Sequence, residues 1–426
     1  RRGTVNRLKH GALAADVSEG DTVVVLGSGA LGLLTIAALR RFGRKCTIIA
    51  VAKHPHQQEL AHEFAVDEIR PKAEHWDEES VYPIDTIRQA HEMGLLNLHI
   101  PEAYGGAGLG SLEEVLVNEE LAWGDPGFAT AAYATALACA PIITGATEEQ
   151  KNIWLRKVTE EGALASYAIT EPGAGSDVAA LKTTAIRDGD EYVLNGSKMW
   201  ITNGNIADVA IVWAHTDNGI EGFVVPTNTP GFKANLVKHK MSLRASITSE
   251  LVFENVRLPA SAVLPEVQTL RGPLSCLSEA RFGILFGVVG AARDCLETAI
   301  DYQLNRHQFN RPLAAFQLSQ QKIADMAIAT GNGMLLAAHL GKLKDQHLLR
   351  PEQVSVGKKN NVRMALEVAR ESRSMLGGSG ITLEYPIIRH MNNLESVYTY
   401  EGTNEIHTLV VGQALTGIAA YADYKA

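Results

Sequence analysis

From residue 57 onward, the spacing of apolar residues changes twice along the chain, which divides it into three segments. Between residues 57 and 165, and again after Pro273, apolar side chains recur every three or four positions, which is typical of amphipathic helices. Between residues 166 and 272, short β-branched runs are separated by Gly, Asn, Asp and Pro, which predicts a small antiparallel β-barrel. The predicted strands are 192–201, 209–214, 222–225 and 251–256, and the predicted C-terminal helices are 285–299, 318–344, 362–375 and 404–421. The pattern therefore predicts an α+β chain that is mainly α.

The first 56 residues follow a different pattern. Residues 22–26 and 47–51 are β-branched apolar runs, and GSGALG at 27–32 fits GxGxxG between them, as in a dinucleotide-binding βαβ unit. This segment resembles the opening of the cofactor domain of medium-chain alcohol dehydrogenases. Ala52 and Lys53 stand where an acidic residue should bind the ribose, and no further parallel strands follow Pro71. We therefore expect residues 1–56 to be an isolated, partial Rossmann-like βαβ fragment left from a fusion. An NAD(P)-linked alcohol dehydrogenase and an inactive chimera are the alternatives.

The composition is that of a soluble globular protein. Of the residues, 46% are hydrophobic and 20% are charged, and the net charge of -9 is spread along the chain, so no basic face indicates nucleic acid. Cys46, Cys139, Cys276 and Cys295 are widely spaced without a neighbouring His/Cys cluster, which favours reduced thiols and no metal site. No apolar run reaches the roughly 18 residues that a membrane span needs, so we expect no membrane span.

Three motifs suggest chemistry. The sequence YAITEPGAGSD occupies residues 167–177, MWITN occupies 199–203 and YEGTNE occupies 400–405. In this order the motifs closely resemble the acyl-CoA dehydrogenase family, and the resemblance extends over residues 57–421. It implies an N-terminal helical domain (57–165), a β-barrel domain (166–272) and a C-terminal four-helix bundle (273–426).

The resemblance also implies FAD as cofactor, an acyl-CoA thioester as substrate and α,β-dehydrogenation as the reaction. Electrons would pass to an electron-transfer flavoprotein. We expect the protein in the bacterial cytoplasm or the mitochondrial matrix.

Glu401 is the residue that matches the catalytic base of the family. A carboxylate with a pKa of about 4 is a weak base in water, but burial beside an apolar acyl chain would raise its pKa toward neutrality. The backbone N–H of Glu401 would bind the thioester carbonyl, and the hydride would pass to flavin N5. A known variant in the family instead carries the base on a bundle helix, one residue before an arginine. Here Arg281 is that arginine and Ala280 precedes it, so the alternative base is missing.

The contacts of the cofactor and substrate are also implied by the resemblance. Thr170 and Thr202 would hydrogen-bond the flavin ring, and Trp200 would pack against it. Further flavin contacts are expected at Tyr167, Ile169 and Ser176. The FAD of a neighbouring subunit would meet Arg306, Phe309, Gln317, Leu376, Gly377 and Gly378, and Thr403 and Glu405 would contact the same cofactor. The expected substrate contacts are Ser176, Arg281, Tyr400, Gly402 and Tyr421. Such sharing between subunits implies a homotetramer built as a dimer of dimers.

The two halves of the chain resemble different members of the family. From about Trp213 onward the sequence is close to glutaryl-CoA dehydrogenases, on the sequences MSLRAS at 241–246, GKLKD at 341–345, KNN at 359–361 and TYEG at 399–402. Residues 57–210 are more similar to medium-chain acyl-CoA dehydrogenases. Glutaryl-CoA dehydrogenase, which also decarboxylates its product to crotonyl-CoA, is therefore an alternative function.

One position argues against that alternative. Glutaryl enzymes carry an arginine for the distal carboxylate just after a Gly-aromatic pair. Here Ala129 follows Gly127 and Phe128, and Tyr133 stands where a second polar partner is expected. A buried carboxylate without a counter-ion is unfavourable, so we expect a straight-chain short or medium acyl-CoA as the better substrate. If glutaryl-CoA is preferred, Arg244 is the first residue to test.

Overall fold

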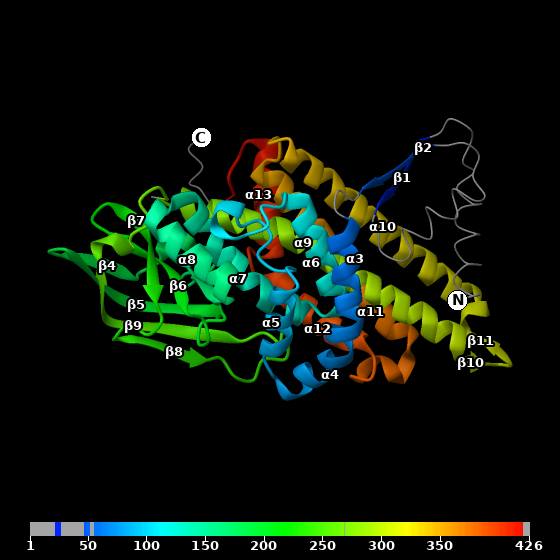
Figure 1. The fold of residues 1–426 in the computed structure, drawn as a ribbon. Helices are drawn as coiled ribbons and strands as arrows, with labels where there is room; N and C mark the ends of the chain where they lie inside the picture. The colour runs from blue at the N-terminus through cyan, green and yellow to red at the C-terminus, as the bar shows by residue number, and fades with distance from the viewer. Residues whose placement is uncertain (1–21, 27–46, 52–54, 268, 421–426) are drawn as a thin grey trace.

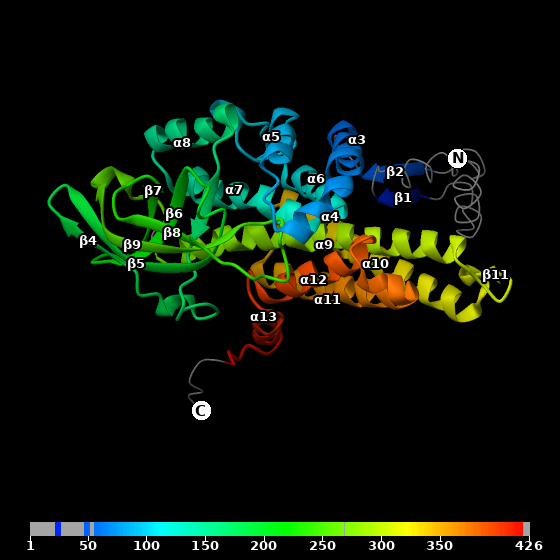
Figure 2. The same ribbon diagram turned by 90° about the horizontal axis from the view of Figure 1, so that it is seen from below.

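The computed structural model describes residues 22–26, 47–51, 55–267 and 269–420. N-terminal helices and a curled sheet pack against a C-terminal helical bundle (Figure 1). The longest helix of the bundle, α9 (Arg271–Asn305), runs from beside the sheet to a small hairpin at the opposite end (Figure 2). This arrangement confirms the predicted fold class.

The elements of the three parts follow one another in sequence. The helices before the sheet are α3 (Pro55–Phe64), α4 (Arg70–Glu79), α5 (Ile84–Glu92), α6 (Ser111–Gly124), α7 (Pro126–Gly145) and α8 (Glu148–Glu161). The strands of the sheet are β3 (Ala165–Ala168), β4 (Thr184–Asp188), β5 (Glu191–Thr202), β6 (Val209–Thr216), β7 (Gly219–Pro226), β8 (Phe232–Leu236) and β9 (Thr248–Pro259). After α9 come the hairpin strands β10 (His307–Gln308) and β11 (Arg311–Pro312), and then α10 (Gln317–Asp345), α11 (Pro351–Met375), α12 (Pro386–Thr399) and α13 (Asn404–Thr416).

The sheet is mixed rather than purely antiparallel. Its order is β3-β6-β4-β5-β9-β8, with β7 paired to β6, and β3 and β4 run parallel to β6. Strand β6 is apolar along most of its length because both of its faces are covered. Ile211 and Trp213 pack into a core shared with α7 and α8, whereas Val212 and Ala214 point to the other face and fill the inside of the sheet.

Helix α9 is common to several cores. Leu277 packs with the sheet, Phe286 packs with α6 and α10, and Ala292 lies in the core of the bundle. Gly290 allows α6 to approach α9 closely, because a Cβ at this position would lie 2.0 Å from the Glu119 carbonyl oxygen. The helix therefore positions the N-terminal helices, the sheet and the bundle relative to one another.

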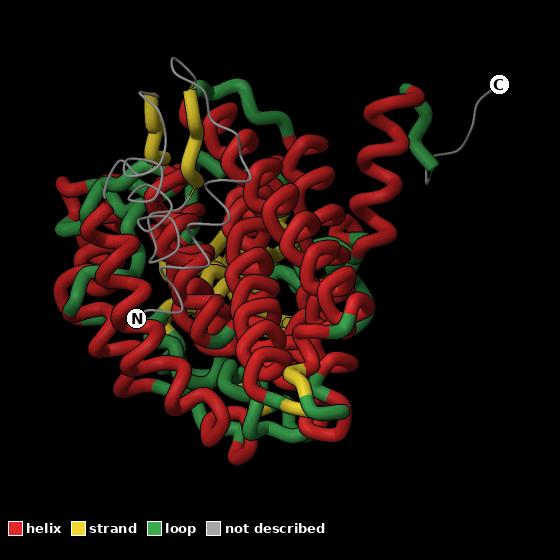
Figure 3. The backbone as a smooth tube through the Cα atoms, turned by 90° about the vertical axis from the view of Figure 1, so that its right-hand side faces the viewer, coloured by secondary structure: helices red, strands yellow, loops and turns green. Residues whose placement is uncertain are grey.

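The C-terminal bundle differs from the sequence prediction at its last two helices. Helix α12 was missed, although it packs against both α9 and α11. The predicted helix 404–421 corresponds to α13, which ends at Thr416 and stands away from the bundle (Figure 3). The fourth helix packed in the bundle is therefore α12.

Part of the N-terminal fragment is described. Strands β1 (Thr22–Leu26) and β2 (Thr47–Val51) pair in parallel, with Thr22 opposite Thr47, as expected for a βαβ unit. The glycine motif at 27–32, together with Ala52 and Lys53, lies outside the described residues.

Two long helices bear on the expectation of no membrane span. By length and composition alone, α7 and α9 could each cross a membrane, but 67% and 61% of their most apolar windows are buried within the protein. The core helices of many proteins pass the same test, so the expectation stays a prediction. Cys139, Cys276 and Cys295 are free and buried, and Cys46 lies outside the described residues.

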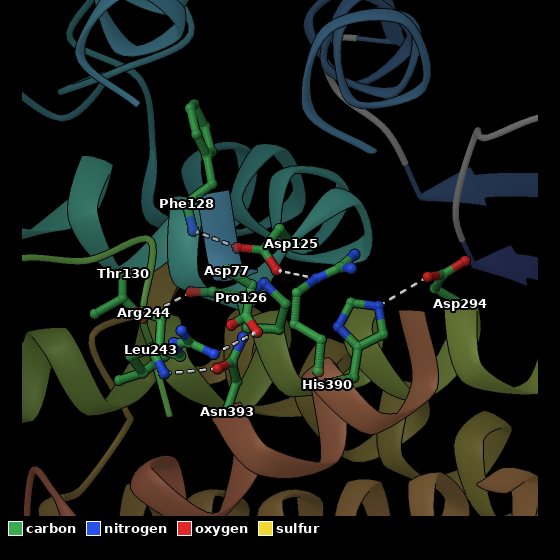
Figure 4. Close-up of polar contacts among 11 residues, drawn as sticks. Asp77, Asp125, Pro126, Phe128, Thr130, Leu243, Arg244, Asp294, His390 and Asn393 are labelled. Atoms are coloured by element: carbon green, nitrogen blue, oxygen red, sulfur yellow. Dashed lines mark hydrogen bonds and ion pairs between the residues drawn. The ribbon is translucent and has the colours of Figure 1, made fainter. Parts of the chain in front are cut away.

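A buried ion pair joins α12 to the first turn of α7. Arg389 Nε donates to Asp125 Oδ1 over 2.9 Å, and both side chains are almost fully buried. The second carboxylate oxygen of Asp125 accepts from the Phe128 N–H over 2.8 Å (Figure 4). Asp125 therefore caps α7 and pairs with Arg389 at the same time.

Two neighbouring residues of α12 reach other parts of the fold. Asn393 Oδ1 accepts from the Leu243 N–H over 2.6 Å, which ties α12 to the loop between β8 and β9 (Figure 4). His390 Nε2 lies 2.8 Å from Asp294 Oδ2 on α9, and Arg70 of α4 pairs with the other oxygen of Asp294. Polar contacts from one helix thus connect all three parts of the fold.

We expect Arg389→Met to lower the free energy of unfolding by about 3–5 kcal/mol, because it leaves the Asp125 carboxylate buried without its partner. Urea denaturation followed by circular dichroism measures this change. Arg370→Met is the matched control, because Arg370 of α11 forms an exposed pair with Glu395 of α12, and its loss should cost at most about 1 kcal/mol. Equal losses in the two variants would contradict the structural role of Arg389.

Candidate active site

The turn between α12 and α13 carries Glu401 in an unusual backbone conformation. Glu401 has φ 55° and Gly402 has φ 87°, so two successive residues lie in the left-handed region. Such a backbone is unfavourable for a residue other than glycine and often occurs at functional sites. At Gly402 a Cβ would also lie 3.0 Å from His407 Nε2, so the turn is crowded on its inner side.

Two cations, the half-buried Arg281 and the buried Lys358, hold the main chain of this turn. Arg281 Nε, from α9, donates to the Glu401 carbonyl oxygen over 2.7 Å. Lys358 Nζ, from α11, donates to the Gly402 carbonyl oxygen over 2.8 Å and also to that of Tyr400. Three consecutive carbonyl groups are therefore bound from two helices of the bundle.

The Glu401 side chain lies in surroundings that favour its neutral form. Burial raises its pKa, while the positive charges of Arg281 and Lys358 oppose that rise. Its Oε2 atom is buried and has no hydrogen-bond partner among the residues that the structure describes. Burial, reinforced by the same two cations, lowers the pKa of His407 to about 3, so its imidazole is neutral near pH 7. A carboxyl group of this kind can take up a proton at neutral pH.

A second group of predicted residues gathers where β3 ends beside β5. The Met199 N–H donates to the Thr170 carbonyl oxygen over 2.8 Å, which brings the 167–177 and 199–203 motifs together. Trp200 lies in an irregular part of the β5–β9 pairing with φ 66°, and its side chain is 58% exposed. Thr170 and Thr202 are half-buried beside it, Ile169 is buried and Ser176 is exposed.

A buried ion pair supports this second group. Lys198 Nζ lies 2.8 Å from Glu171 Oε1 and also donates to the Ile169 carbonyl oxygen. The carboxylate of Glu171 further accepts from the Lys182 and Thr183 N–H groups. These hydrogen bonds lower the pKa of Glu171 to about 2 even though burial raises it. The pair fixes the loop that follows β3 onto β5.

Tyr167 connects the two groups. Its hydroxyl donates to the Pro273 carbonyl oxygen in the first turn of α9 over 3.0 Å. Burial raises the pKa of Tyr167, and the neighbouring Cys276 and Glu401 side chains raise it further. The end of β3 therefore lies within electrostatic range of the Glu401 turn.

Comparison with known proteins agrees with this geometry. Residues 52–162, 166–256 and 271–416 match the N-terminal, middle and C-terminal domains of acyl-CoA dehydrogenases. The chain belongs to the acyl-CoA dehydrogenase family.

Four solved structures show this similarity. Glutaryl-CoA dehydrogenase from Mycobacterium smegmatis is 51% identical, with 87% of this chain and 96% of that chain covered and a TM-score of 0.85. A structure of a glutaryl-CoA dehydrogenase from that organism in complex with FADH2 is also 51% identical, with coverages of 86% and 95% and a TM-score of 0.84. Butyryl-CoA dehydrogenase from Megasphaera elsdenii is 34% identical, with coverages of 84% and 97% and a TM-score of 0.81. A structure described as the electron transferring flavoprotein of Acidaminococcus fermentans is 35% identical, with coverages of 84% and 97% and a TM-score of 0.82.

Within this acyl-CoA dehydrogenase fold, the predicted contacts to a neighbouring FAD lie far from Glu401. Arg306, Phe309 and Gln317 are exposed around the hairpin at the end of α9, about 37 Å along that helix from Arg281 at a rise of about 1.5 Å per residue. Leu376 is buried after α11, and Gly377 and Gly378 are exposed next to it. The structure therefore does not bring these residues to the Glu401 turn of the same chain.

The residues after Glu401 have local roles. Thr403 caps α13, because its hydroxyl accepts from the Ile406 N–H over 3.2 Å, and Glu405 is exposed in the first turn of that helix. Tyr400 is half-buried, and burial raises the pKa of its hydroxyl to about 12. Tyr421 lies outside the described residues.

The residues considered for a distal carboxylate are engaged elsewhere. Ala129 is buried in an apolar core, and the Tyr133 hydroxyl donates to the Glu114 carbonyl oxygen over 2.8 Å. Arg244 is tied to the end of α4, where its guanidinium donates to the Glu78 carbonyl oxygen over 2.6 Å and also to the Ser80 hydroxyl (Figure 4 shows its approach to Asp77). None of these side chains is a free counter-ion.

The sequence analysis missed Lys358, Lys198 and Glu171 as parts of the site. A signal for Lys358 was present, because it lies on the buried stripe of α11 at helical spacing between Val354 and Val362. A lysine on an apolar stripe indicates a buried charge that needs partners. Glu171 lies within the 167–177 motif, but its partners come from the segment before β4 and from β5, so no local signal showed its pairing.

Proposed function

We propose that this protein is an FAD-dependent acyl-CoA dehydrogenase in which Glu401 removes the α proton of an acyl-CoA thioester. The observation that carries this proposal is the Glu401 carboxyl group, whose pKa is raised by burial and whose buried Oε2 atom has no hydrogen-bond partner in the described part of the chain, in a turn held by two cations. Membership of the family supports the same reaction, cofactor and substrate class.

In the proposed reaction, the side chain and the backbone of Glu401 have separate roles. The Glu401 carboxylate accepts the proton from Cα, the double bond forms between Cα and Cβ, and the hydride leaves from Cβ. FAD, when bound, supplies the hydride acceptor. The backbone N–H of Glu401 donates to the thioester carbonyl and stabilises the negative charge that develops there. Burial of the carboxyl group excludes water and keeps its pKa high enough for proton abstraction.

The region around Trp200 fits a flavin. An indole ring that is more than half exposed, held by a left-handed backbone, offers a flat apolar surface. Thr202 lies two residues further along β5, and Thr170 lies in the segment after β3, where its carbonyl oxygen accepts from the Met199 N–H; both have hydroxyl groups that can donate to ring atoms. We propose that these three residues hold the flavin ring. We also propose an electron-transfer flavoprotein as the electron acceptor, on the family resemblance.

We further propose a homotetramer built as a dimer of dimers. The exposed hairpin with Arg306 and Phe309, whose side chain is 86% exposed, supports this proposal because it is too distant to serve its own chain. Helix α13 also exposes Leu415, and the segment after it exposes Ile418. We expect sedimentation of the FAD-loaded protein to give the mass of four chains, and a monomer at micromolar concentration would contradict the shared cofactor contacts.

We expect Glu401→Gln to retain FAD but to reduce it about 10²–10⁴-fold more slowly with acyl-CoA, because an amide cannot accept the α proton. Anaerobic stopped-flow bleaching of the flavin measures this rate. Glu395→Gln is the control, because Glu395 is an exposed glutamate of α12. Bleaching of Glu401→Gln at the wild-type rate would remove Glu401 from the role of base.

The acyl group is the second part of the proposal. Similarity to a glutaryl-CoA dehydrogenase at 51% identity favours glutaryl-CoA. Ala129 favours a straight chain, because selectivity for a distal carboxylate requires a counter-ion in the N-terminal helical part, where Ala129 is buried among apolar side chains. We propose that Ala129, rather than the overall identity, determines the preferred acyl group. The C-terminal half supplies contacts that are common to all acyl-CoA substrates.

We therefore expect kcat/KM for butyryl- or hexanoyl-CoA to exceed that for glutaryl-CoA by at least about tenfold, for which about 1.4 kcal/mol is sufficient. Initial rates with the three thioesters measure the ratio. A higher kcat/KM for glutaryl-CoA, with release of CO2, would contradict the expectation. Arg244→Met would then show whether Arg244 leaves its contacts with α4 to bind the carboxylate.

A further inference from the structure

Lys358 is a fully buried lysine in the bundle. It lies on α11, its relative exposure is 1%, and its neighbours on the same face of the helix, Val354 and Val362, are also buried. Burying an ammonium group is unfavourable unless hydrogen bonds and opposite charge replace its hydration. The contacts of Lys358 are therefore informative about its role.

Both of the hydrogen bonds described for the ammonium group go to the Glu401 turn. Lys358 Nζ donates to the carbonyl oxygens of Tyr400 and Gly402, the residues on either side of Glu401. The carbonyl oxygen between them accepts from Arg281 instead. Two alternate carbonyl groups that converge on one nitrogen require a tight turn, which agrees with the left-handed backbone at Glu401 and Gly402.

The charge of Lys358 also acts on the carboxyl group. The titratable or charged groups that face Lys358 are Glu401 and Tyr400 of the turn, Arg281 of α9 and His407 of α13. His407 is neutral near pH 7 because burial lowers its pKa to about 3. Burial lowers the pKa of Lys358 to about 7, and the Glu401 carboxylate opposes this fall. That carboxylate is the negative charge that Lys358 and Arg281 share.

We infer that Lys358 is a positioning residue for the dehydrogenation, because its ammonium group fixes the main chain on both sides of Glu401 and so directs the Glu401 carboxylate at the α proton. This inference rests on the proposed function. Lys358 does not touch the reacting atoms itself, and its effect passes through the turn that it holds.

The test uses the full-length, FAD-loaded protein with Lys358→Met, which removes the charge but keeps the length of the side chain. We expect the flavin content to be retained and the rate constant of flavin bleaching at saturating butyryl-CoA to fall by about 10²-fold, the size of effect expected when a reacting group is misplaced by about 1 Å. The KM should change much less than kcat. Lys322→Met is the matched control, because Lys322 pairs with Glu371 on the exposed side of the bundle.

The pH dependence of the bleaching rate distinguishes an effect of Lys358 on Glu401 from a general effect of Lys358 on the stability of the fold. Burial raises the pKa of Glu401, and the charge of Lys358 is one of two that oppose this rise. Removing that charge raises the pKa further, so a smaller fraction of Glu401 is deprotonated at a given pH. The acid limb of the bleaching rate should therefore move to higher pH in Lys358→Met and stay in place in Lys358→Arg, which keeps the charge.

Each outcome decides the inference. If Lys358→Met bleaches the flavin at the wild-type rate and the acid limb of its pH profile does not move, the inference is overturned. If Lys358→Met fails to retain FAD, Lys358→Ala is assayed with n-propylammonium and with n-propanol. Restored bleaching with the cation alone supports the inference, and no restoration with either overturns it. A wild-type protein that holds FAD but is bleached by no acyl-CoA overturns the proposed function, and the inference with it.

Discussion

The ion pair between Arg389 and Asp125 is the interaction on which the arrangement of the site depends. It joins the helix that leads into the Glu401 turn to the first turn of α7, the helix that carries Ala129. Because both side chains are buried, neither can move without leaving an uncompensated charge. The helix that leads into the Glu401 turn and the helix that carries Ala129 are therefore linked by a buried charged contact and its hydrogen-bonded neighbours.

Much of the fold could be predicted from the sequence, because the change from helical spacing to short β-branched runs and back is a local signal. The long apolar helices and the strand β6 follow that signal. Helix α12 does not show this apolar spacing, because Arg389, His390 and Asn393 place polar groups on its buried side. The partners of these residues, such as Asp125 and Asp294, are distant in the sequence, so nothing local shows that the polar groups are satisfied. The parallel pairing of β3 with β6 is likewise a long-range feature.

The residues of the candidate site also divide into those that local motifs predict and those that only long-range contacts reveal. Glu401, Arg281, Tyr167 and Trp200 could be predicted from the family resemblance, because Arg281 matches the arginine beside the base of a family variant and the other three lie in the short motifs. The structure brings the first three into electrostatic range of one another, whereas the hairpin residues lie at the other end of α9. The buried cation Lys358 was not predicted, since a lysine on a helix is usually solvated. Its role depends on the turn of a segment more than forty residues away.

The way in which the Glu401 turn is held has a consequence for how the site can change. Arg281 and Lys358 bind main-chain oxygen atoms, which every amino acid possesses. The geometry of the turn is therefore independent of the side chain at position 401, apart from the strain of a left-handed residue that glycine would relieve. Scaffold and reactive group are separable here, so substitution at this one position can exchange or remove the chemistry during evolution while the surrounding architecture is inherited intact.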